Sequence, residues 1–346
     1  MRDRDRIPDQ RLRNQLITRP GSRRPDKVVA WLGAVQAQEY GPAKWGLALR
    51  SSTGITDAMI ERAIDQGRIL RTHVLRPTWH FVSPADIRWM LDLTGPIVHR
   101  RMSPYDRRMG LDPETLIRAT GVIEKALGDG AHLTRGELGV ELTHAGLPGR
   151  TRELAHIMMY AELEGVVCSG PRRGKQSTYA LLADRAPAAR RLDRDAALGE
   201  LARRYFRSHG PATVRDFVWW SGLGTADAKR GVEISRARGW EVDGVKYWTI
   251  GPSPRVTRSR KTGVHLLPVY DEYLVAYRDH HAVPRPAYVM GSLQHALVIG
   301  GQVAGAWKAI PGSTSVGVTP TRRLTPGDRR AVAQAATRYG RFLALS

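Results

Sequence analysis

One order of elements recurs three times in the first 250 residues, and it constrains the fold more than any other feature of this chain. In each repeat, apolar residues recur at helical spacing, and a turn-rich stretch of β-branched and aromatic residues follows them. Helix, helix, turn, helix and then a two-stranded wing is the order of the winged helix-turn-helix. We therefore predict an α+β fold with three tandem winged helix-turn-helix units, over residues 8–83, 111–184 and 193–250.

The first unit is predicted from its periodicity. Residues 69–82 are rich in β-branched and aromatic side chains and are interrupted at Arg76-Pro77, which indicates a hairpin. Apolar residues at helical spacing predict three helices before it, over residues 11–18, 27–36 and 56–67.

The second and third units are predicted from helix caps and turns. Asp112-Pro113 is an N-cap followed by proline at the first helical position, and Thr134 with Glu137 has the spacing of a capping box. The third unit repeats these signals, with a cap at Thr213 and Asp216 and a tight hairpin turn at Asp243-Gly244.

The chain after the third unit follows another pattern. Short strand-like runs over residues 264–270, 296–299 and 302–306 alternate with glycine and proline. We predict a small β-barrel-like domain over residues 255–346. Residues 251–263, rich in proline, arginine and serine, are the predicted linker.

The charge of the chain favours a polyanionic partner. Lys and Arg number 54 against 33 Asp and Glu, a net charge of +21, and only eight of the 54 are lysine. A GC-rich genome would raise the arginine content, but it would not remove acidic residues, because GC-rich codons also supply Asp and Glu. Arginine suits bidentate contacts with phosphate, so we predict nucleic acid as the partner.

The predicted wing of the second unit carries basic residues at its tip. Its segment from Gly170 to Ser177 resembles a phosphate loop, but only three residues separate the glycines and Gln176 follows the lysine. A phosphate loop needs four residues there and a Ser or Thr after the lysine, which excludes a nucleotide hydrolase. A basic wing on the DNA backbone and a merely solvated loop both fit the tip residues, Arg172, Arg173 and Lys175.

Several other classes are excluded. Cys168 is the only cysteine, which rules out an intramolecular disulfide and a thiolate-rich metal site. The histidines are scattered, so no metal is expected. The longest apolar run, residues 28–35, is too short to span a membrane, and no apolar stretch follows the charged N-terminus. We expect a cytoplasmic protein. The adjacent Asp271 and Glu272 would diverge on a strand, which favours a structural or hydrogen-bonding role over acid–base catalysis.

Gln36-Ala37-Gln38, followed by Gly41-Pro42, resembles the Gln-apolar-Gln signature of the AlkZ-type bacterial DNA glycosylases. The resemblance extends over essentially the whole chain. Further segments that resemble the family are residues 70–82, 209–213, 219–223, 270–273 and 305–308.

The resemblance implies a fold, a reaction and a catalytic pair. The family has three tandem winged-helix units and a C-terminal β-barrel bent around duplex DNA. Its members excise bulky N7-alkylated purines, and some unhook interstrand crosslinks. The catalytic pair would be Gln36 and Gln38. Related members have aspartate at the second position of the motif. This sequence has glutamine there, so it resembles the AlkZ branch.

A glutamine pair suits this chemistry. Alkylation at N7 makes the purine cationic, so it can leave without a general acid, and the enzyme has to support an oxocarbenium-like sugar and hold a water. A glutamine amide can orient that water, although it accepts its proton weakly. Gln36 and Gln38 would lie about 200° apart on a helix, so we expect them to converge where the helix ends, at Gly41-Pro42. The alternative is that both are ordinary polar residues near a helix terminus.

The predicted first hairpin supplies candidate DNA contacts. Strand alternation places Arg71 and His73 on one face and Arg76 and His80 on the other, so at most one pair faces DNA. Trp79 is expected in the core rather than as a platform for a base. The remaining candidate DNA-binding residues are Lys308 and the wing residues Arg172, Arg173 and Lys175.

Together these features predict a monomeric, cofactor-free DNA glycosylase that acts on alkylated purines in duplex DNA without an obligate protein partner. Monofunctional excision is expected, because Lys44, the one lysine close in sequence to the glutamines, lies beyond Gly41-Pro42. The alternative is a winged-helix transcriptional regulator with no catalytic activity. Release of N7-methylguanine from DNA would separate the two.

Overall fold

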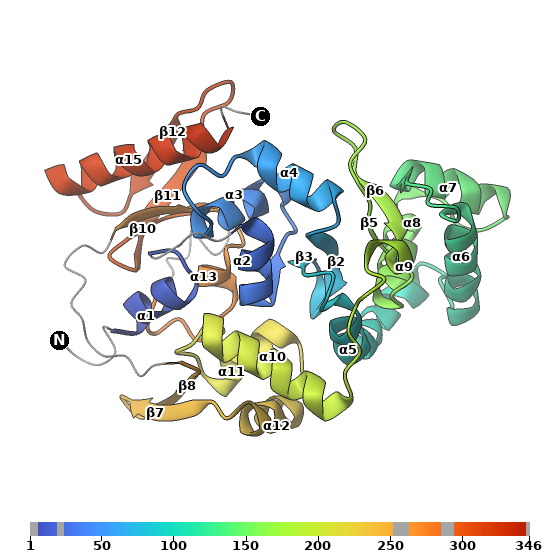
Figure 1. The fold of residues 1–346 in the computed structure, drawn as a ribbon, viewed down its shortest axis with the longest axis horizontal. Coiled ribbons are helices and arrows are strands. Elements are labelled where there is room, and N and C mark those ends of the chain that lie inside the picture. The colour runs from blue at the N-terminus through green and yellow to red at the C-terminus, as the bar shows by residue number, and fades with distance from the viewer. Residues whose placement is uncertain (1–5, 19–23, 252–262, 285–293, 344–346) are drawn as a thin grey trace.

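A computed structural model describes residues 6–18, 24–251, 263–284 and 294–343, which fold into helices and small antiparallel sheets (Figure 1). The first region contains four helices and a three-stranded sheet in the order β1-β3-β2. Its elements are α1 (Ile7–Asn14), α2 (Pro25–Leu32), β1 (Ala34–Gln36), α3 (Tyr40–Arg50), α4 (Asp57–Asp65), β2 (Leu70–Val74) and β3 (Arg76–Val82).

The helix predicted over residues 27–36 is wrong in its second half. Helix α2 ends at Leu32, and Gly33 takes a φ of +89°, a conformation that favours glycine and redirects the chain. The next residues form β1, in which Gln36 pairs with His80 of β3. The first glutamine of the motif therefore belongs to a sheet.

The predicted role of Gly41-Pro42 as a helix end is also wrong. The two residues lie in the first turn of α3, which begins at Tyr40. Proline is tolerated there because the first backbone N–H groups of a helix have no intrahelical acceptor. The predicted hairpin over residues 69–82 is confirmed, and its turn is at Leu75, which has a φ of +64°.

The second region begins with the long helix α5, which the sequence analysis did not predict and which contains Pro96 and Pro104. The predicted N-cap of Asp112 and the capping box of Thr134 with Glu137 are both confirmed. The elements are α5 (Ile87–Arg108), α6 (Pro113–Ala126), β4 (Leu133–Thr134), α7 (Arg135–His144), α8 (Thr151–Leu163), β5 (Val167–Ser169), β6 (Thr178–Leu181) and α9 (Leu182–Arg185).

The third region contains three helices and a hairpin. Thr213 and Asp216 form the predicted capping box, and the hairpin turns at Asp243-Gly244, where both residues have positive φ. Its elements are α10 (Arg194–Ser208), α11 (Val214–Ser221), α12 (Thr225–Ser235), β7 (Arg238–Val242) and β8 (Val245–Thr249).

The C-terminal region differs from the predicted β-barrel-like domain. Its described strands form an open four-stranded antiparallel sheet in the order β12-β11-β10-β9 and do not close into a barrel. An 18-residue helix, α15, packs on the sheet and was not predicted. The predicted linker lies almost entirely outside the described residues. The elements are β9 (Val264–Leu267), α13 (Glu272–Val275), β10 (His295–Ile299), β11 (Gln302–Ala309), β12 (Val316–Pro320) and α15 (Pro326–Leu343).

The hydrophobic cores do not follow the predicted unit boundaries. One core joins the first region to the C-terminal sheet and α15, and another joins the first hairpin to α5 and the third region. Only the second region has a core of its own. The first hairpin contributes Phe81 to one shared core and Leu70 and Val82 to the other, so it lies where the two meet. Burial on both sides makes this hairpin a rigid support for functional groups.

The described residues contain neither a candidate membrane span nor a candidate metal site. No helix among them combines the length and apolar composition needed to cross a membrane. No group of three or more His, Cys, Asp or Glu side chains in the same part of the chain is placed to hold a metal ion.

Candidate active site

Gln36 and Gln38 lie at the end of β1 and just beyond it. Gln36 is the last residue of β1, and the backbone N–H of Ala37 donates to the carbonyl oxygen of Trp79 at 2.7 Å, which continues the pairing with β3. Gln38 follows in a bend, and the side-chain oxygens of both glutamines accept hydrogen bonds from residues of β3, Arg76 and Trp79. Strand β3, and not a helix end, therefore brings the two side chains together.

Gln36 is held at both its backbone and its side chain. Its backbone N–H donates to Oε1 of Glu272 at 2.7 Å, and its side-chain Oε1 accepts from Nη2 of Arg76 at 2.9 Å. The residue is 9% exposed. Because arginine has only donors, its contact identifies the atom it meets as the amide oxygen and turns the amide nitrogen of Gln36 away.

Glu272 lies fully buried beneath Gln36. It accepts hydrogen bonds from Nε1 of Trp220 at 2.9 Å and Nε2 of His209 at 3.3 Å. Burial alone would raise the pKa of Glu272, but the hydrogen bond from His209, the charge of Arg76 and the backbone N–H of Gln36 outweigh it and lower the pKa to about 2. Burial lowers the pKa of His209, so its ring is neutral near pH 7 and acts on Glu272 as a donor. Glu272 is therefore a carboxylate at neutral pH.

Asp271 and Glu272 diverge, as expected from the sequence. Asp271 points away from Glu272, binds Arg50 through both carboxylate oxygens at 2.7 and 2.8 Å, and caps α13. Sequence reasoning nevertheless missed the link between Glu272 and Gln36. The only signal was the segment 270–273, which resembled the family without revealing its contact.

Gln38 is held more loosely than Gln36. It is half-buried, and its Oε1 accepts from the backbone N–H of Trp79 at 3.4 Å. Within the described residues, the side-chain nitrogen of neither Gln36 nor Gln38 donates to a protein acceptor, and neither is a buried orphan. Both amides therefore keep N–H donors available to a ligand or water.

The predicted alternation of the first hairpin is confirmed. His80 pairs with Gln36 and lies beside Arg76, and its Nε2 is 3.5 Å from Nη2 of that arginine. His80 is 0% exposed, and burial together with the charge of Arg76 lowers its pKa to about 3. His73, on the opposite face, is 5% exposed and contacts Glu162 through Nδ1. Neither histidine has surface to offer to a phosphate, which corrects their assignment as direct DNA contacts.

Arg71 supports the glutamine segment from the opposite face. Its Nε donates to the carbonyl oxygen of Ala37 at 3.0 Å, and its Nη2 donates to that of Gln38 at 3.4 Å. Burial lowers the pKa of Arg71, and the carboxylate of Glu162 opposes this shift. Arg71 therefore fixes the backbone of the segment, whereas Arg76 fixes a side chain.

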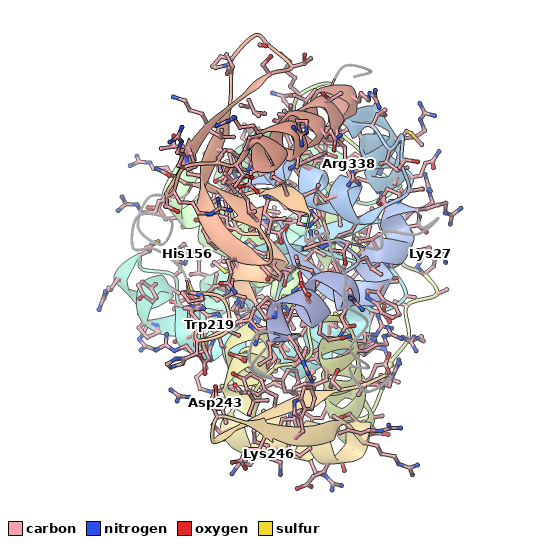
Figure 2. All side chains as sticks on the ribbon, turned by 90° about the vertical axis from the view of Figure 1, so that its left-hand side faces the viewer. Lys27, His156, Trp219, Asp243, Lys246 and Arg338 are labelled. Carbon is pink, nitrogen blue, oxygen red and sulfur yellow. The ribbon has the colours of Figure 1, made fainter. Side chains whose placement is uncertain are left out.

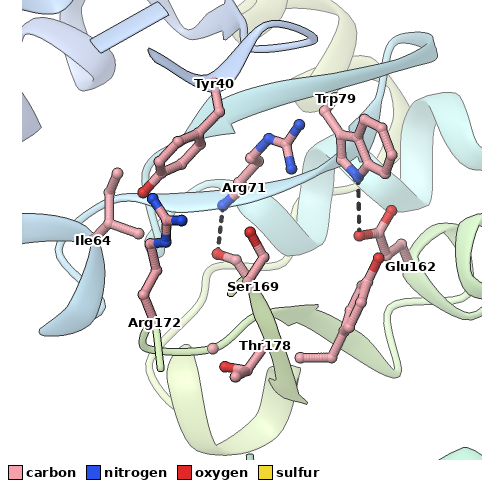
Figure 3. Close-up of a pocket in the computed structure, with 11 residues that line it drawn as sticks. Tyr40, Ile64, Arg71, Trp79, Glu162, Ser169, Arg172 and Thr178 are labelled. Carbon is pink, nitrogen blue, oxygen red and sulfur yellow. Dashed lines mark hydrogen bonds between the residues drawn. The ribbon is translucent and has the colours of Figure 1, made fainter. Parts of the chain in front are cut away.

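A pocket opens beside Arg71 (Figure 3). It encloses about 380 Å³, its open mouth included. The Arg71 guanidinium lies 4.3 Å from the Trp79 ring and 5.6 Å from that of Tyr40. Trp79 is half-buried and lines this pocket, so placing it in the core was wrong. The lining is Tyr40, Ile64, Arg71, Trp79, Glu162, Ser169, Gly170, Arg172, Ser177, Thr178 and Tyr179.

The basic residues at the tip of the β5–β6 hairpin, the predicted wing, differ in whether a carboxylate binds them. Arg172 binds Glu61 of α4 at 3.0 Å, and Arg173 binds Glu137 at 2.6 Å. Lys175 is exposed, and its ammonium has no partner in the part of the chain that the structure describes. Lys308 is exposed on β11, opposite Gly317.

Lys44 is unavailable as a nucleophile in this geometry. It is 4% exposed, and its Nζ donates to Asp57 at 2.8 Å and to Glu61 at 2.6 Å. A Schiff base requires a neutral amine that reaches the sugar. The Nζ atom of Lys44 is buried and bound to both carboxylates, so it does not reach a substrate in this geometry.

Comparison with known proteins assigns the chain to a family. The family model described as DNA glycosylase AlkZ-like matches residues 29–342. The chain belongs to the AlkZ-like DNA glycosylase family. This membership makes it a glycosylase, a hydrolase of N-glycosyl bonds, and confirms the resemblance found in the sequence.

A curated protein and a solved structure, both from Streptomyces sahachiroi, are similar to this AlkZ-like chain. The interstrand DNA cross-link repair glycosylase is 25% identical over 310 residues, covering 82% of this chain and 81% of its own. The solved structure of DNA glycosylase AlkZ superimposes with a TM-score of 0.81 at 23% identity, covering 99% of this chain and 96% of its own. The overall fold is thus shared with AlkZ.

Proposed function

We propose that this glycosylase is monofunctional and hydrolyses the N-glycosidic bond of N7-alkylated purines in duplex DNA, including purines joined in interstrand crosslinks. The observation that carries the proposal is the placement of the Gln36 and Gln38 side chains together against β3, with Gln36 held by Arg76 and Glu272. The relative named as a cross-link repair glycosylase supports the crosslink as a substrate.

The reaction assigned to this site needs little proton transfer. The cationic purine leaves as a neutral base, so the barrier depends on support for the oxocarbenium-like sugar and on a water near C1′. The loosely held oxygen of Gln38 has a lone pair that can orient this water. The buried carboxylate of Glu272 supplies negative potential beneath Gln36 without competing for the water.

The proposal also covers the cations that bind DNA. We propose that Arg173, Lys175 and Lys308 contact phosphates and that Arg76 reaches the lesion strand. Arg172 would also contact a phosphate, either while it stays paired with Glu61 or after it leaves Glu61. The regions 8–83, 111–184 and 193–250 would act as winged-helix units, followed by the region 255–346. We further propose that the protein acts as a monomer in the cytoplasm, without a cofactor or an obligate protein partner.

The test is base release from a duplex oligonucleotide containing one 7-methylguanine. Gln36→Ala and Gln38→Ala should each lower the single-turnover rate about ten- to a thousandfold, as expected for one polar contact at a developing charge. DNA affinity should change little, because these contacts matter mainly in the transition state. Gln66→Ala, at the exposed end of α4, is the matched control and should keep the full rate.

Full activity of the Gln36→Ala, Gln38→Ala double variant would contradict the catalytic assignment. A covalent enzyme–DNA complex trapped by borohydride would contradict monofunctional excision, since it requires an amine nucleophile. A wild-type protein that binds the duplex but releases no base would contradict the proposed substrate.

A further inference from the structure

Trp219 is the only exposed tryptophan of the nine in the chain, all of which lie in described residues. It is 44% exposed, whereas its neighbour Trp220 is fully buried. Figure 2 shows Trp219 at the surface, above the hairpin that carries Asp243 and Lys246. Both tryptophans belong to α11, whose helical period turns one inward and the next outward. The period explains the exposure, but not why a large aromatic residue occupies the outward position.

The indole of Trp219 is anchored next to the catalytic face. Its Nε1 donates to the carbonyl oxygen of Val275 at 2.9 Å, and Val275 ends α13, the helix that begins with Glu272. Arg76 also links the backbone of Trp219 to Gln36. The Nη1 of Arg76 lies 3.4 Å from the carbonyl oxygen of Trp219, while its Nη2 binds Gln36. One guanidinium therefore spans the distance between Trp219 and Gln36.

A second guanidinium lies over the indole ring. The Cζ atom of Arg278 is 5.2 Å from the ring centroid of Trp219, and the backbone N–H of Arg278 is held by Asp216 at 2.8 Å. Among the described residues, no other ring or cation contacts this indole. The ring thus keeps open apolar surface bordered by arginine, a combination suited to a base-like group beside phosphates.

We propose that Trp219 is a specificity-determining residue that stacks against a planar substituent of the lesion. This inference rests on the proposed excision of N7-alkylated purines. The N7 atom faces the major groove, so a large substituent extends away from the base and needs protein surface beside the catalytic groups. An anchored indole provides such surface at little entropic cost. The site then favours N7 adducts that carry a planar polycyclic group over methyl or flexible aliphatic adducts.

The test compares three duplexes with one N7-alkylguanine each: methyl, a flexible aliphatic chain, and a planar polycyclic group. For Trp219→Ala, the ratio of kcat/KM on the planar adduct to that on 7-methylguanine should fall about five- to a hundredfold, the effect of losing one stacked contact. The flexible adduct should follow the methyl adduct. Trp219→Phe should restore part of the ratio, because it keeps an aromatic face.

Tyr105→Ala is the matched control, since Tyr105 is another exposed aromatic residue with an arginine, Arg108, over its ring. It should leave the ratio unchanged. An unchanged ratio in Trp219→Ala, or equal losses on all three duplexes, would overturn the proposal. Circular dichroism and thermal melting of each variant exclude unfolding as the cause, and Trp219→Phe tests the same point if the alanine variant does not fold. Absence of excision by the wild-type protein would instead contradict the proposed function itself.

Discussion

The two faces of the sheet β1-β3-β2 hold the same short segment in different ways. On one face, Arg76 binds the side chain of Gln36. On the other face, Arg71 binds the backbone carbonyls at 37 and 38 and lies between two aromatic rings. One arginine therefore orients the side chain of Gln36, the proposed catalytic residue, and the other fixes the backbone that carries it.

The difference separates the orientation of a side chain from the support of a backbone. A guanidinium that meets a side-chain amide determines which amide atom is presented to a ligand, and this matters at the transition state. A guanidinium that meets backbone carbonyls satisfies buried polar groups, and this contributes mainly to stability. The two arginines are five residues apart on one hairpin, so sequence distance alone does not distinguish their roles.

The largest expected effect separates these two arginines. Arg76→Met removes the donor that holds Gln36, and we expect the single-turnover excision rate to fall about ten- to a thousandfold. Arg71→Met leaves two carbonyl groups unsatisfied, so we expect the free energy of unfolding to fall by about 1–3 kcal/mol with a smaller loss of rate. Single-turnover kinetics and urea unfolding on both variants provide the comparison.

Arg76→Lys sharpens this test. Lysine keeps the charge but lacks the fork that reaches Gln36 and Trp219 together, so its rate should lie between those of the wild type and Arg76→Met. If the Arg76 and Arg71 variants lost rate and stability in equal proportion, the division between orienting and supporting roles would be wrong.

The sequence predicted those elements whose signals are local. The capping box of Thr134 and Glu137 and the turn at Asp243-Gly244 each depend on residues within three positions of one another, and both are present. Strand β1 was mistaken for helix because its hydrogen bonds come from β3, more than forty residues away, while its own residues continue an apolar run. Local propensity cannot report a partner at that distance.

The same limit applies to the candidate site. Gln36 and Gln38 were found because they form a contiguous motif, but the carboxylate that holds Gln36 is 236 residues further along the chain. His80 was grouped with DNA contacts because it is basic and near Arg76. Its burial depends on packing between the two shared cores, which strand alternation does not describe.

The next prediction concerns two buried titrating groups next to Gln36, namely His80 and Glu272. The pKa of His80 is about 3 when folded and near 6.5 when unfolded, so between these values only the unfolded chain is protonated. Stability should therefore fall as the pH is lowered from 6.5 toward 3, with a slope of about 1.4 kcal/mol per pH unit from this residue. Glu272, with a pKa of about 2, adds a loss in the same direction below about pH 4.5.

Urea unfolding at pH 7 and pH 5 measures this slope. His80→Gln should lose most of the His80 contribution, whereas His144→Gln, which removes an exposed histidine at the end of α7, should retain it. The excision rate should change little between pH 6 and 8, because neither His80 nor Glu272 titrates there. A steep rate change in that range would indicate that another group transfers a proton.

The smallest expected effect concerns the contact between the DNA backbone and the predicted wing of the second region, the β5–β6 hairpin. This wing lies on the side of the first hairpin that carries Arg71. If about six phosphates are neutralised, the logarithm of the binding constant should fall with the logarithm of salt concentration at a slope near −5. Lys175→Gln should reduce this slope by about 0.9, because its ammonium has no protein partner among the described residues to give up. Arg172→Gln should reduce it less, since this guanidinium already binds Glu61.

Fluorescence anisotropy across the salt range measures each slope. Lys125→Gln, which removes an exposed charge at the end of α6, is the control for charge alone. If replacing Arg172, Arg173 and Lys175 together left the slope at its wild-type value, the wing would be a solvated loop. The phosphate contacts would then have to come from the surface around Gln36 and Gln38.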